Sequence, residues 1–375
     1  MRDCVKILVT GDFSPVNRVE KLVLDEKYEK IFNDFYPYLL DSDLNITNLE
    51  CPLIDAKHPI DKIGPTLRAN ERCIELLKYG NFHLITLSNN HIMDHGDSGL
   101  MSTIRLCQEN KIEWVGAGRN LDEASLIWYK KIKNMKIAIL NFSEIEFSTA
   151  GELSPGSNPL EPIMNFYSIQ SAKKNADYVI VIVHGGHESY QLPSPRMVRT
   201  YRYFIDSGAD LIVGHHTHCF SGYEKYKGKM IYYSIGNFIF DHKSMKNLDW
   251  NYGYAIKVLL NNSKVTSEII PYKQCNEIPG VHMLNEEETI KFEKELHNLN
   301  KIIHSESMFK RRWEEFINEK KNEYKLKLEC IDFYLYQVLR SRGFIPSPLS
   351  NKRKLRLLHM LRCQSHRDLS IESLK

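Results

Sequence analysis

Short apolar runs alternate with amphipathic stretches over residues 1–272 of the chain. Patterns of helical spacing between the early runs predict helices over 19–40, 71–79 and 98–110. Alternation of strand and helix indicates a layered α/β fold, and the later runs follow one another with little helix between them, so part of the sheet is expected to be antiparallel. The predicted strands are 6–10, 44–48, 84–87, 136–142, 179–183, 211–213, 230–234, 254–260 and 265–270.

The pattern changes near residue 279, where charged residues with apolar positions at helical spacing take over. They predict helices over 286–299, 308–322 and 325–341, and a basic helix restarts at 352–361. Residues 143–165 are rich in Ser, Gly, Pro and Asn and are expected to form a long loop. We therefore expect a domain of layered mixed β-sheets flanked by helices over 1–272, followed by a helical, basic extension over 273–375.

The net charge of +3 hides an asymmetry along the 375 residues. Residues 340–375 hold nine Lys and Arg against two Asp and Glu, a net of +7, so the rest of the chain carries −4. A body of this charge argues against a dedicated nucleic-acid binder. The tail is open to three interpretations: a helix packed on its own domain, a surface for an anionic membrane or a partner protein, or a nucleic-acid contact.

No apolar run approaches the length of a membrane-spanning helix, and the N-terminus does not have the pattern of a secretory leader. A cytoplasmic protein is expected, peripheral at the inner membrane face if the tail binds there. Eight cysteines without a CxxC pair predict packed thiols, neither a disulfide framework nor a thiolate zinc site. Five of the 15 histidines, in contrast, fall within residues 184–218.

Polar clusters follow five of the predicted strands directly. Each one alone is ordinary for a loop or turn, but the loops at strand ends of an open α/β sheet gather around one ligand site. Carboxylates, an Asn amide and imidazoles together suit Mn, Fe or Zn, and their number suggests two ions bridged by a carboxylate, an arrangement that hydrolyses phosphoesters. The clusters are Gly11-Asp12, Asn48-Leu49-Glu50, Ser88-Asn89-Asn90-His91, 184–188 and 214–218.

These segments resemble the calcineurin-like metallophosphoesterase superfamily, and more narrowly its CapA/PgsA-type branch of capsule and poly-γ-glutamate biosynthesis proteins. The resemblance covers about residues 5–245. It depends on NLECPL (48–53), LSNNHIMDHG (87–96), GAGRN (116–120), VHGGHE (183–188), GADLIVGHHTH (208–218) and YSIGNFIFD (233–241). It implies a calcineurin-like fold, one or two divalent transition-metal ions, and a phosphorylated or polyanionic substrate.

The resemblance also implies roles for single residues. His91 matches the general acid, and Asp94 is placed beside it in the catalytic set, although a turn before the next helix is an equal alternative for Asp94. Asn237 contacts substrate or holds a turn. The implied metal ligands are Asp12, Glu50 in place of a bridging Asp, Asn90, His184, His216 and His218; the implied surrounding residues are Asn48, His187, Glu188, His215 and Asn237.

One departure from the superfamily pattern bears on the activity. The usual first motif is Asp-x-His, whereas Asp12 is followed by Phe13 and Ser14, so one ligand is missing. Two main hypotheses remain. The first is an enzyme, a metal-dependent phosphoesterase acting in capsule or exopolymer assembly. The alternative is a non-catalytic assembly factor of a membrane-bound polymer synthase, bound through residues 340–375. A nucleotidase or nuclease is a third, weaker hypothesis, and the absence of a basic core argues against a nuclease.

Overall fold

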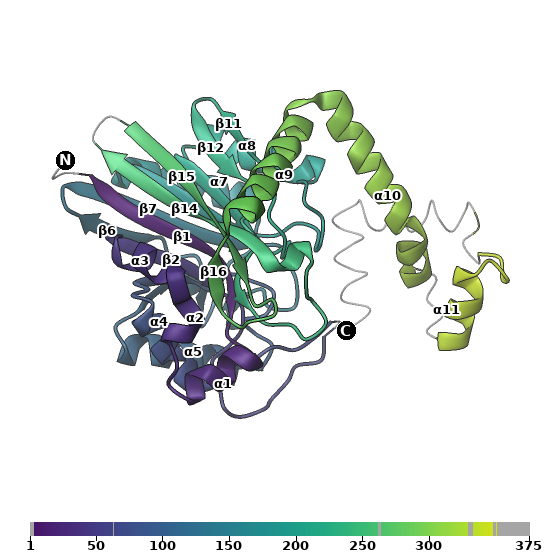
Figure 1. Cartoon of the computed structure of the whole chain (residues 1–375), viewed down its shortest axis with the longest axis horizontal. Coiled ribbons are helices and arrows are strands. Elements are labelled where there is room, and N and C mark those ends of the chain that lie inside the picture. The colour runs from purple at the N-terminus through teal and green to yellow at the C-terminus, as the bar shows by residue number, and fades with distance from the viewer. Residues whose placement is uncertain (1–3, 63, 262–263, 329–332, 348–349, 351–375) are drawn as a thin grey trace. The chain divides into compact units, whose positions relative to one another are not determined.

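The computed structural model describes residues 4–62, 64–261, 264–328, 333–347 and 350 (Figure 1). The chain divides into two compact units, Met1–Ser305 and Glu306–Lys375. The first unit holds two large sheets and a two-stranded one, β5 (Ala117–Gly118) with β8 (Gly156–Ser157). The expected α/β class with layered mixed sheets is confirmed.

The first large sheet is built around β1 and has the order β16-β15-β14-β1-β2-β3-β4. β1 pairs in parallel with β2 and antiparallel with β14, so the sheet is mixed as expected. A further short strand, β13, pairs with the end of β1 in parallel. The bounds are β1 (Val5–Ser14), β2 (Leu44–Leu49), β3 (Leu84–Thr86), β4 (Glu113–Val115), β13 (Asn237–Phe240), β14 (Tyr252–Asn261), β15 (Lys264–Gln274) and β16 (Val281–Met283).

The second large sheet has the order β11-β12-β10-β9-β7-β6. Its centre, β7, β9 and β10, is parallel, and its outer pairs β6·β7 and β11·β12 are antiparallel. The central strands are buried on both faces, which explains their continuous apolar sequence. The bounds are β6 (Trp128–Ile132), β7 (Met135–Ser143), β9 (Tyr178–His184), β10 (Leu211–His215), β11 (Tyr223–Tyr226) and β12 (Lys229–Tyr232).

The prediction of a single helix over 19–40 is wrong. Four short helical segments occupy this range: α1 (Arg18–Leu24), α2 (Glu29–Phe32), η1 (Asn33–Phe35) and α3 (Tyr36–Leu40). Glu26 and Asn33 have φ of 59° and 43°, in the left-handed region, and each interrupts the helical path. The apolar spacing is kept through these breaks because the segments wrap around one core.

The helices expected over 71–79, 98–110 and 286–299 are found close to those positions, whereas the helical segments over 121–124, 162–175 and 249–251 were not predicted. The expected loop over 143–165 ends earlier, because α7 begins at Pro162, a residue preorganised for the first turn of a helix. The bounds are η2 (Glu71–Cys73), α4 (Ile74–Tyr79), α5 (Gly96–Glu109), α6 (Leu121–Ala124), α7 (Pro162–Asn175), α8 (Pro195–Asp206), η3 (Asp249–Asn251) and α9 (Glu286–His304).

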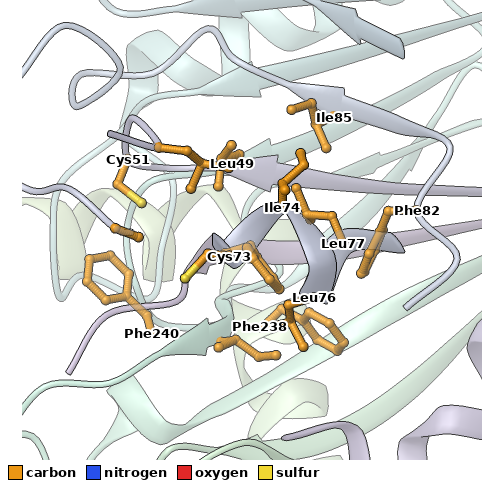
Figure 2. Close-up of a cluster of buried hydrophobic side chains, with 14 of the residues drawn as sticks. Leu49, Cys51, Cys73, Ile74, Leu76, Leu77, Phe82, Ile85, Phe238 and Phe240 are labelled. Carbon is orange, nitrogen blue, oxygen red and sulfur yellow. The ribbon is translucent and has the colours of Figure 1, made fainter. Parts of the chain in front are cut away.

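Figure 2 shows the hydrophobic cluster that joins the first sheet to α4. Side chains from α4, such as Ile74 and Leu77, meet side chains from β2, β3 and β13. Burying one such side chain stabilises the fold by about 1.5–3 kcal/mol. Cys51 and Cys73 lie in the same cluster as free thiols, and burial raises the pKa of Cys51 to about 12. Thiols in this state are packing groups, as the sequence predicts.

The compact unit extends beyond the expected boundary at residue 272. β15 continues to Gln274, β16 adds the edge strand, and α9 packs on the sheets through Phe292, whose ring lies 4.6 Å from that of Phe220. The second unit contains α10 (Glu306–Leu328) and α11 (Tyr334–Ser341). The helix expected over 352–361 lies outside the described residues. None of the helices in the described part of the chain is long and apolar enough to cross a membrane.

Candidate metal centre

Both large sheets contribute polar side chains to one site at the carboxyl ends of their strands. In parallel sheets these ends are where ligand-binding loops gather. All of the side chains that the sequence predicts as metal ligands are buried there. They are Asp12 in β1, Glu50 after β2, Asn90 after β3, His184 at the end of β9, and His216 and His218 after β10.

The donor atoms form two overlapping groups. One group is Asp12, Glu50 and His184, and the other is Glu50, His216 and His218; the donor atoms of each lie within 4.8 Å of one another. Glu50 belongs to both groups, which is the place a bridging carboxylate would take. Asn90 joins them through Oδ1, which lies 3.0 Å from Nε2 of His184.

Glu50 is the most unusual of these side chains. Its carboxyl group is fully buried, and neither oxygen has a hydrogen-bond partner among the described residues. Oε1 of Glu50 lies 3.4 Å from Nε2 of His184 and 3.7 Å from Nε2 of His218. Burial, and then the charge of Asp12, raises the pKa of Glu50 well above its usual range. A buried carboxyl left this way is costly unless a cation joins it.

Asp12 is held rigidly by its neighbours. Oδ1 accepts hydrogen bonds from Nδ2 of Asn48 at 2.7 Å and from Nδ1 of His215 at 3.0 Å, and Oδ2 accepts one from the backbone N–H of His216 at 3.0 Å. Burial would raise the pKa of Asp12, but the hydrogen bond from His215 and the imidazole charges around it hold that pKa below its ordinary value. Asn48 and His215 thus both contact Asp12, and their supporting roles stay predictions.

The three histidines of the donor groups, His184, His216 and His218, have lowered pKa values and are neutral near pH 7. Burial, then the charge of His216, lowers the pKa of His184 well below its usual value, and burial, then the charge of His218, lowers that of His216 to about 4. Burial also lowers the pKa of His218. Neutral imidazole is the form that binds metal, so these rings need not lose a proton to do so near neutral pH.

The backbone that carries two of these rings is strained. His216 has φ of 89° and His218 has φ of 57°, both in the left-handed region that L-residues rarely adopt. Such conformations persist where the surroundings impose them, and they concentrate at functional sites. The tight turn directs both rings back into the site, which matches their spacing of one residue.

The side chain of Asn237 forms a hydrogen bond with the ring of His218. Its Oδ1 lies 2.9 Å from Nδ1 of His218, and its Nδ2 donates to the backbone oxygens of His218 and Trp250. The ring of Trp250 packs on His218 with 4.6 Å between centroids. The first contact holds the proton on Nδ1 and leaves Nε2 as a ligand, which is how partners of metal-binding histidines act. Trp250 was not expected, because nothing in its local sequence indicates the site.

His91 and Asp94 form a hydrogen-bonded pair, with Nδ1 of His91 2.6 Å from Oδ2 of Asp94. Asp94 also accepts hydrogen bonds from the backbone N–H of Leu67 at 2.6 Å and from Nζ of Lys62 at 2.5 Å. Asp94 lies in the turn directly before α5, and its carboxylate contacts His91, so a catalytic role for Asp94 stays a prediction. Lys62 is a residue that sequence reasoning missed, because it lies in a polar loop and only tertiary structure buries it.

Ser14 and two of the expected surrounding residues, His187 and Glu188, stand apart from the donor groups. Ser14, at the position where the superfamily has His, is buried with its hydroxyl lacking a partner among the described residues, and it is in neither donor group. His187 is half-buried and Glu188 is exposed, on the loop after β9. The charge of Glu188 raises the pKa of Glu50, so it lies within electrostatic range of the site. Direct roles for His187 and Glu188 stay predictions.

Comparison with known proteins places residues 6–242 within the family described as bacterial capsule synthesis protein PGA_cap. The capsule biosynthesis protein CapA of Bacillus anthracis is 34% identical over 251 residues, which are 64% of this chain and 61% of that protein. The PGA biosynthesis protein CapA of Bacillus subtilis is 34% identical over 244 residues, 64% of each chain. This chain thus matches less than two thirds of the length of these relatives.

Similar solved structures are more distant. A hypothetical protein from Thermus thermophilus has a TM-score of 0.44 at 15% identity, covering 71% of this chain and 99% of that one. A 5′-nucleotidase from Candida albicans has a TM-score of 0.41 at 12% identity, covering 86% of this chain and 57% of that one. We draw no conclusion about chemistry from either.

Proposed function

This chain belongs to the family of bacterial capsule synthesis proteins PGA_cap, and we propose that it is a metal-dependent phosphoester hydrolase that acts in the assembly of a capsule or exopolymer. The Bacillus relatives are named for capsule and PGA biosynthesis, which supports a polymer of the poly-γ-glutamate kind. The substrate in this proposal is phosphorylated or polyanionic. We place the protein in the cytoplasm or at the inner membrane face.

One observation carries the proposal: the buried carboxyl of Glu50 has no hydrogen-bond partner in the described structure and faces His184 and His218. The mixed N/O donor set around it fits a divalent transition ion such as Mn, Fe or Zn, with room in the donor count for two. An ion bound there supplies Lewis acidity toward a phosphoryl oxygen and toward water.

The residues of the chain supply the remaining functions. Asn48 and His215 fix Asp12, and Asn237 fixes His218, so the donor set is preorganised before any ion binds. His91, oriented by Asp94, is the group that gives a proton to the leaving alkoxide. A positioned acid of this kind contributes about 10²–10⁴-fold to a rate.

Metal analysis combined with turnover tests the proposal. We expect the purified protein to contain a transition metal and to hydrolyse bis(p-nitrophenyl) phosphate. His91→Ala should lower kcat by about 100-fold or more with metal content unchanged, whereas Asn90→Ala should lower both. His297→Ala, on the exposed face of α9, is the matched control and should change neither. A wild-type protein without metal and without turnover would contradict the proposal.

A non-catalytic assembly factor is the second candidate, favoured by Ser14, which takes the place of the usual His ligand. In this form the chain binds a membrane-bound synthase or an anionic membrane through residues 340–375, most of which lie outside the described residues. Sedimentation with anionic liposomes, with and without residues 340–375, tests that surface. Equal sedimentation of the two forms would rule out membrane binding by the tail.

A further inference from the structure

Lys62 brings a buried positive charge to the site from a loop that is otherwise largely exposed. Its side chain is 2% exposed and that of its partner Asp94 is 0% exposed, whereas residues 55–59 and 64–66 are exposed. A buried ion pair is a weak source of stability, because desolvation offsets the attraction between the charges. Stability alone therefore does not account for a lysine in this place.

The contacts of Lys62 converge on the turn that carries His91. Its Nζ donates to Oδ1 of Asp94 at 2.5 Å and to the backbone oxygen of Asn90, the residue before His91, at 3.1 Å. The loop is attached to the same turn by two further hydrogen bonds, from the N–H of Ile60 to the oxygen of Asp94 and from the N–H of Leu67 to Oδ2 of Asp94. The loop that carries Lys62 and the turn that carries His91 are thus held together by several hydrogen bonds.

The two oxygens of Asp94 bind different partners, and this arrangement determines which ring nitrogen of His91 carries the proton. Oδ1 is occupied by Lys62, which leaves Oδ2 for Nδ1 of His91 at 2.6 Å. Nζ of Lys62, which can only donate, also lies 3.5 Å from Nδ1 of His91, but the carboxylate is much closer to that nitrogen. Because an ionised carboxylate only accepts hydrogen bonds, the closer contact assigns a proton to Nδ1. Nε2 is then the ring nitrogen that takes up a second proton and gives it to a bound molecule, so the ring donates as imidazolium and returns to the Nδ1–H tautomer.

We propose that Lys62 is a positioning residue for His91: it fixes the carboxylate of Asp94 so that Asp94 holds the ring of His91 in one orientation and one tautomer. Its effect on turnover depends on the proposed function, because only a hydrolase needs His91 as a proton donor. Its effect on the ring does not depend on turnover, so the two proposals can fail separately.

Nitrogen-15 NMR of the histidine side chains tests the effect on the ring. We expect wild-type protein to show an Nδ1–H resonance that exchanges slowly with water and is lost in His91→Ala. Lys62→Arg should keep it, and Lys62→Met should lose it through rapid exchange. Lys57→Met, an exposed lysine of the same loop, is the matched control and should keep it. An unchanged resonance in Lys62→Met would overturn the proposal.

Turnover of bis(p-nitrophenyl) phosphate tests the consequence for catalysis. Lys62→Met should lower kcat by about 10- to 100-fold with KM within about twofold of wild type, and Lys62→Arg should recover most of the loss. A raised KM with unchanged kcat would overturn the proposal, because Lys62 would then bind substrate. If Lys62→Met does not fold, Lys62→Gln carries the same comparisons. Absence of wild-type turnover would contradict the hydrolase, and the NMR result would still decide the role of Lys62.

Discussion

Nδ1 of His215 lies 3.0 Å from Oδ1 of Asp12, and the two residues belong to different sheets. Asp12 is in β1 of the first large sheet, and His215 is the last residue of β10 in the second. The histidine donors His184, His216 and His218 lie at the ends of strands of the second sheet or directly after them, while Glu50 and Asn90 follow strands of the first. The donor set is therefore complete only when the two sheets pack in their correct register.

Gly11 allows the close approach of strands that places Asp12. A Cβ added at Gly11 would lie 2.0 Å from the backbone oxygen of Gly236, just before β13. We expect Gly11→Ala to push β1 away from β13, to lower the free energy of unfolding by about 1–3 kcal/mol, and to weaken metal binding. Urea denaturation of the metal-free protein and titration against a chelator measure the two effects.

Gly228→Ala is the control for Gly11→Ala. Gly228 has φ of 81° but no atom within 4 Å of an added Cβ, so its substitution costs about 1–2 kcal/mol from backbone strain alone. Metal affinity should stay at the wild-type value in this variant. Wild-type metal affinity in Gly11→Ala would show that the approach of β1 to β13 does not control the site.

Much of the first unit could be predicted because its strands are continuous apolar runs that end in polar clusters. β9 and β10 are examples: each is buried on both faces and ends in a histidine. Where local propensity and tertiary packing disagree, the prediction failed. The segment 19–40 has the spacing of one helix, but left-handed residues at Glu26 and Asn33 divide it so that it can follow the core.

The candidate ligands could be found from the sequence because each follows a predicted strand. The residues that support them could not be found in this way. Lys62 lies in a polar loop, and Trp250 lies in a short 3₁₀ segment, η3, and both reach the site only through contacts far apart in sequence. The sequence left open whether Asn237 contacts substrate or holds a turn. In the structure Asn237 begins β13 and its side chain contacts His218, a contact that the local pattern does not indicate.

Asn237 offers a test of preorganisation in the donor set. Asn237→Ala removes the partner of Nδ1 of His218, so the ring can turn and its Nε2 is no longer directed at Glu50. We expect metal affinity to fall by about 10- to 100-fold with little change in overall structure. Isothermal titration with Zn²⁺ measures the affinity. Asn175→Ala, at the exposed end of α7, should leave it unchanged; equal affinities in the two variants would argue against the role of Asn237.

Asp241, which follows β13, predicts a pH dependence of stability. Its side chain is buried and accepts hydrogen bonds from Nη2 of Arg18 at 2.7 Å and from the backbone N–H of Arg18 at 2.9 Å. Burial would raise the pKa of Asp241, but the hydrogen bonds and charge of Arg18 lower it below 3.8. A lowered pKa means that the stabilisation is present above pH 3.8 and is lost as pH falls through the folded-state pKa.

We therefore expect Asp241→Asn to lower the free energy of unfolding near pH 7 by about 1–2 kcal/mol, a value reduced by solvent screening because the Arg18 side chain is 38% exposed. The difference from wild type should shrink below pH 3.8, where the native carboxylate is itself becoming protonated. Urea denaturation at a series of pH values measures it. Asp206→Asn, an exposed partner of Lys227, should show little effect. A difference independent of pH would contradict the ionic role.

We expect Glu50 to destabilise the metal-free protein and to stabilise the metal-bound protein. Burial raises the pKa of Glu50, so folding at neutral pH must either bury its charge or protonate it, a cost that neutral Gln does not carry. Glu50→Gln should therefore raise the unfolding free energy of chelator-treated protein by about 1–3 kcal/mol at neutral pH. An ion at 100 times its dissociation constant should then stabilise wild type by about 2.7 kcal/mol and the variant much less, reversing their order. Thermal unfolding with EDTA and with Mn²⁺ or Zn²⁺ measures both states, with exposed Glu152→Gln as control. A variant that is less stable than wild type without metal, or equally stabilised by it, would show that Glu50 is a structural group and not a ligand.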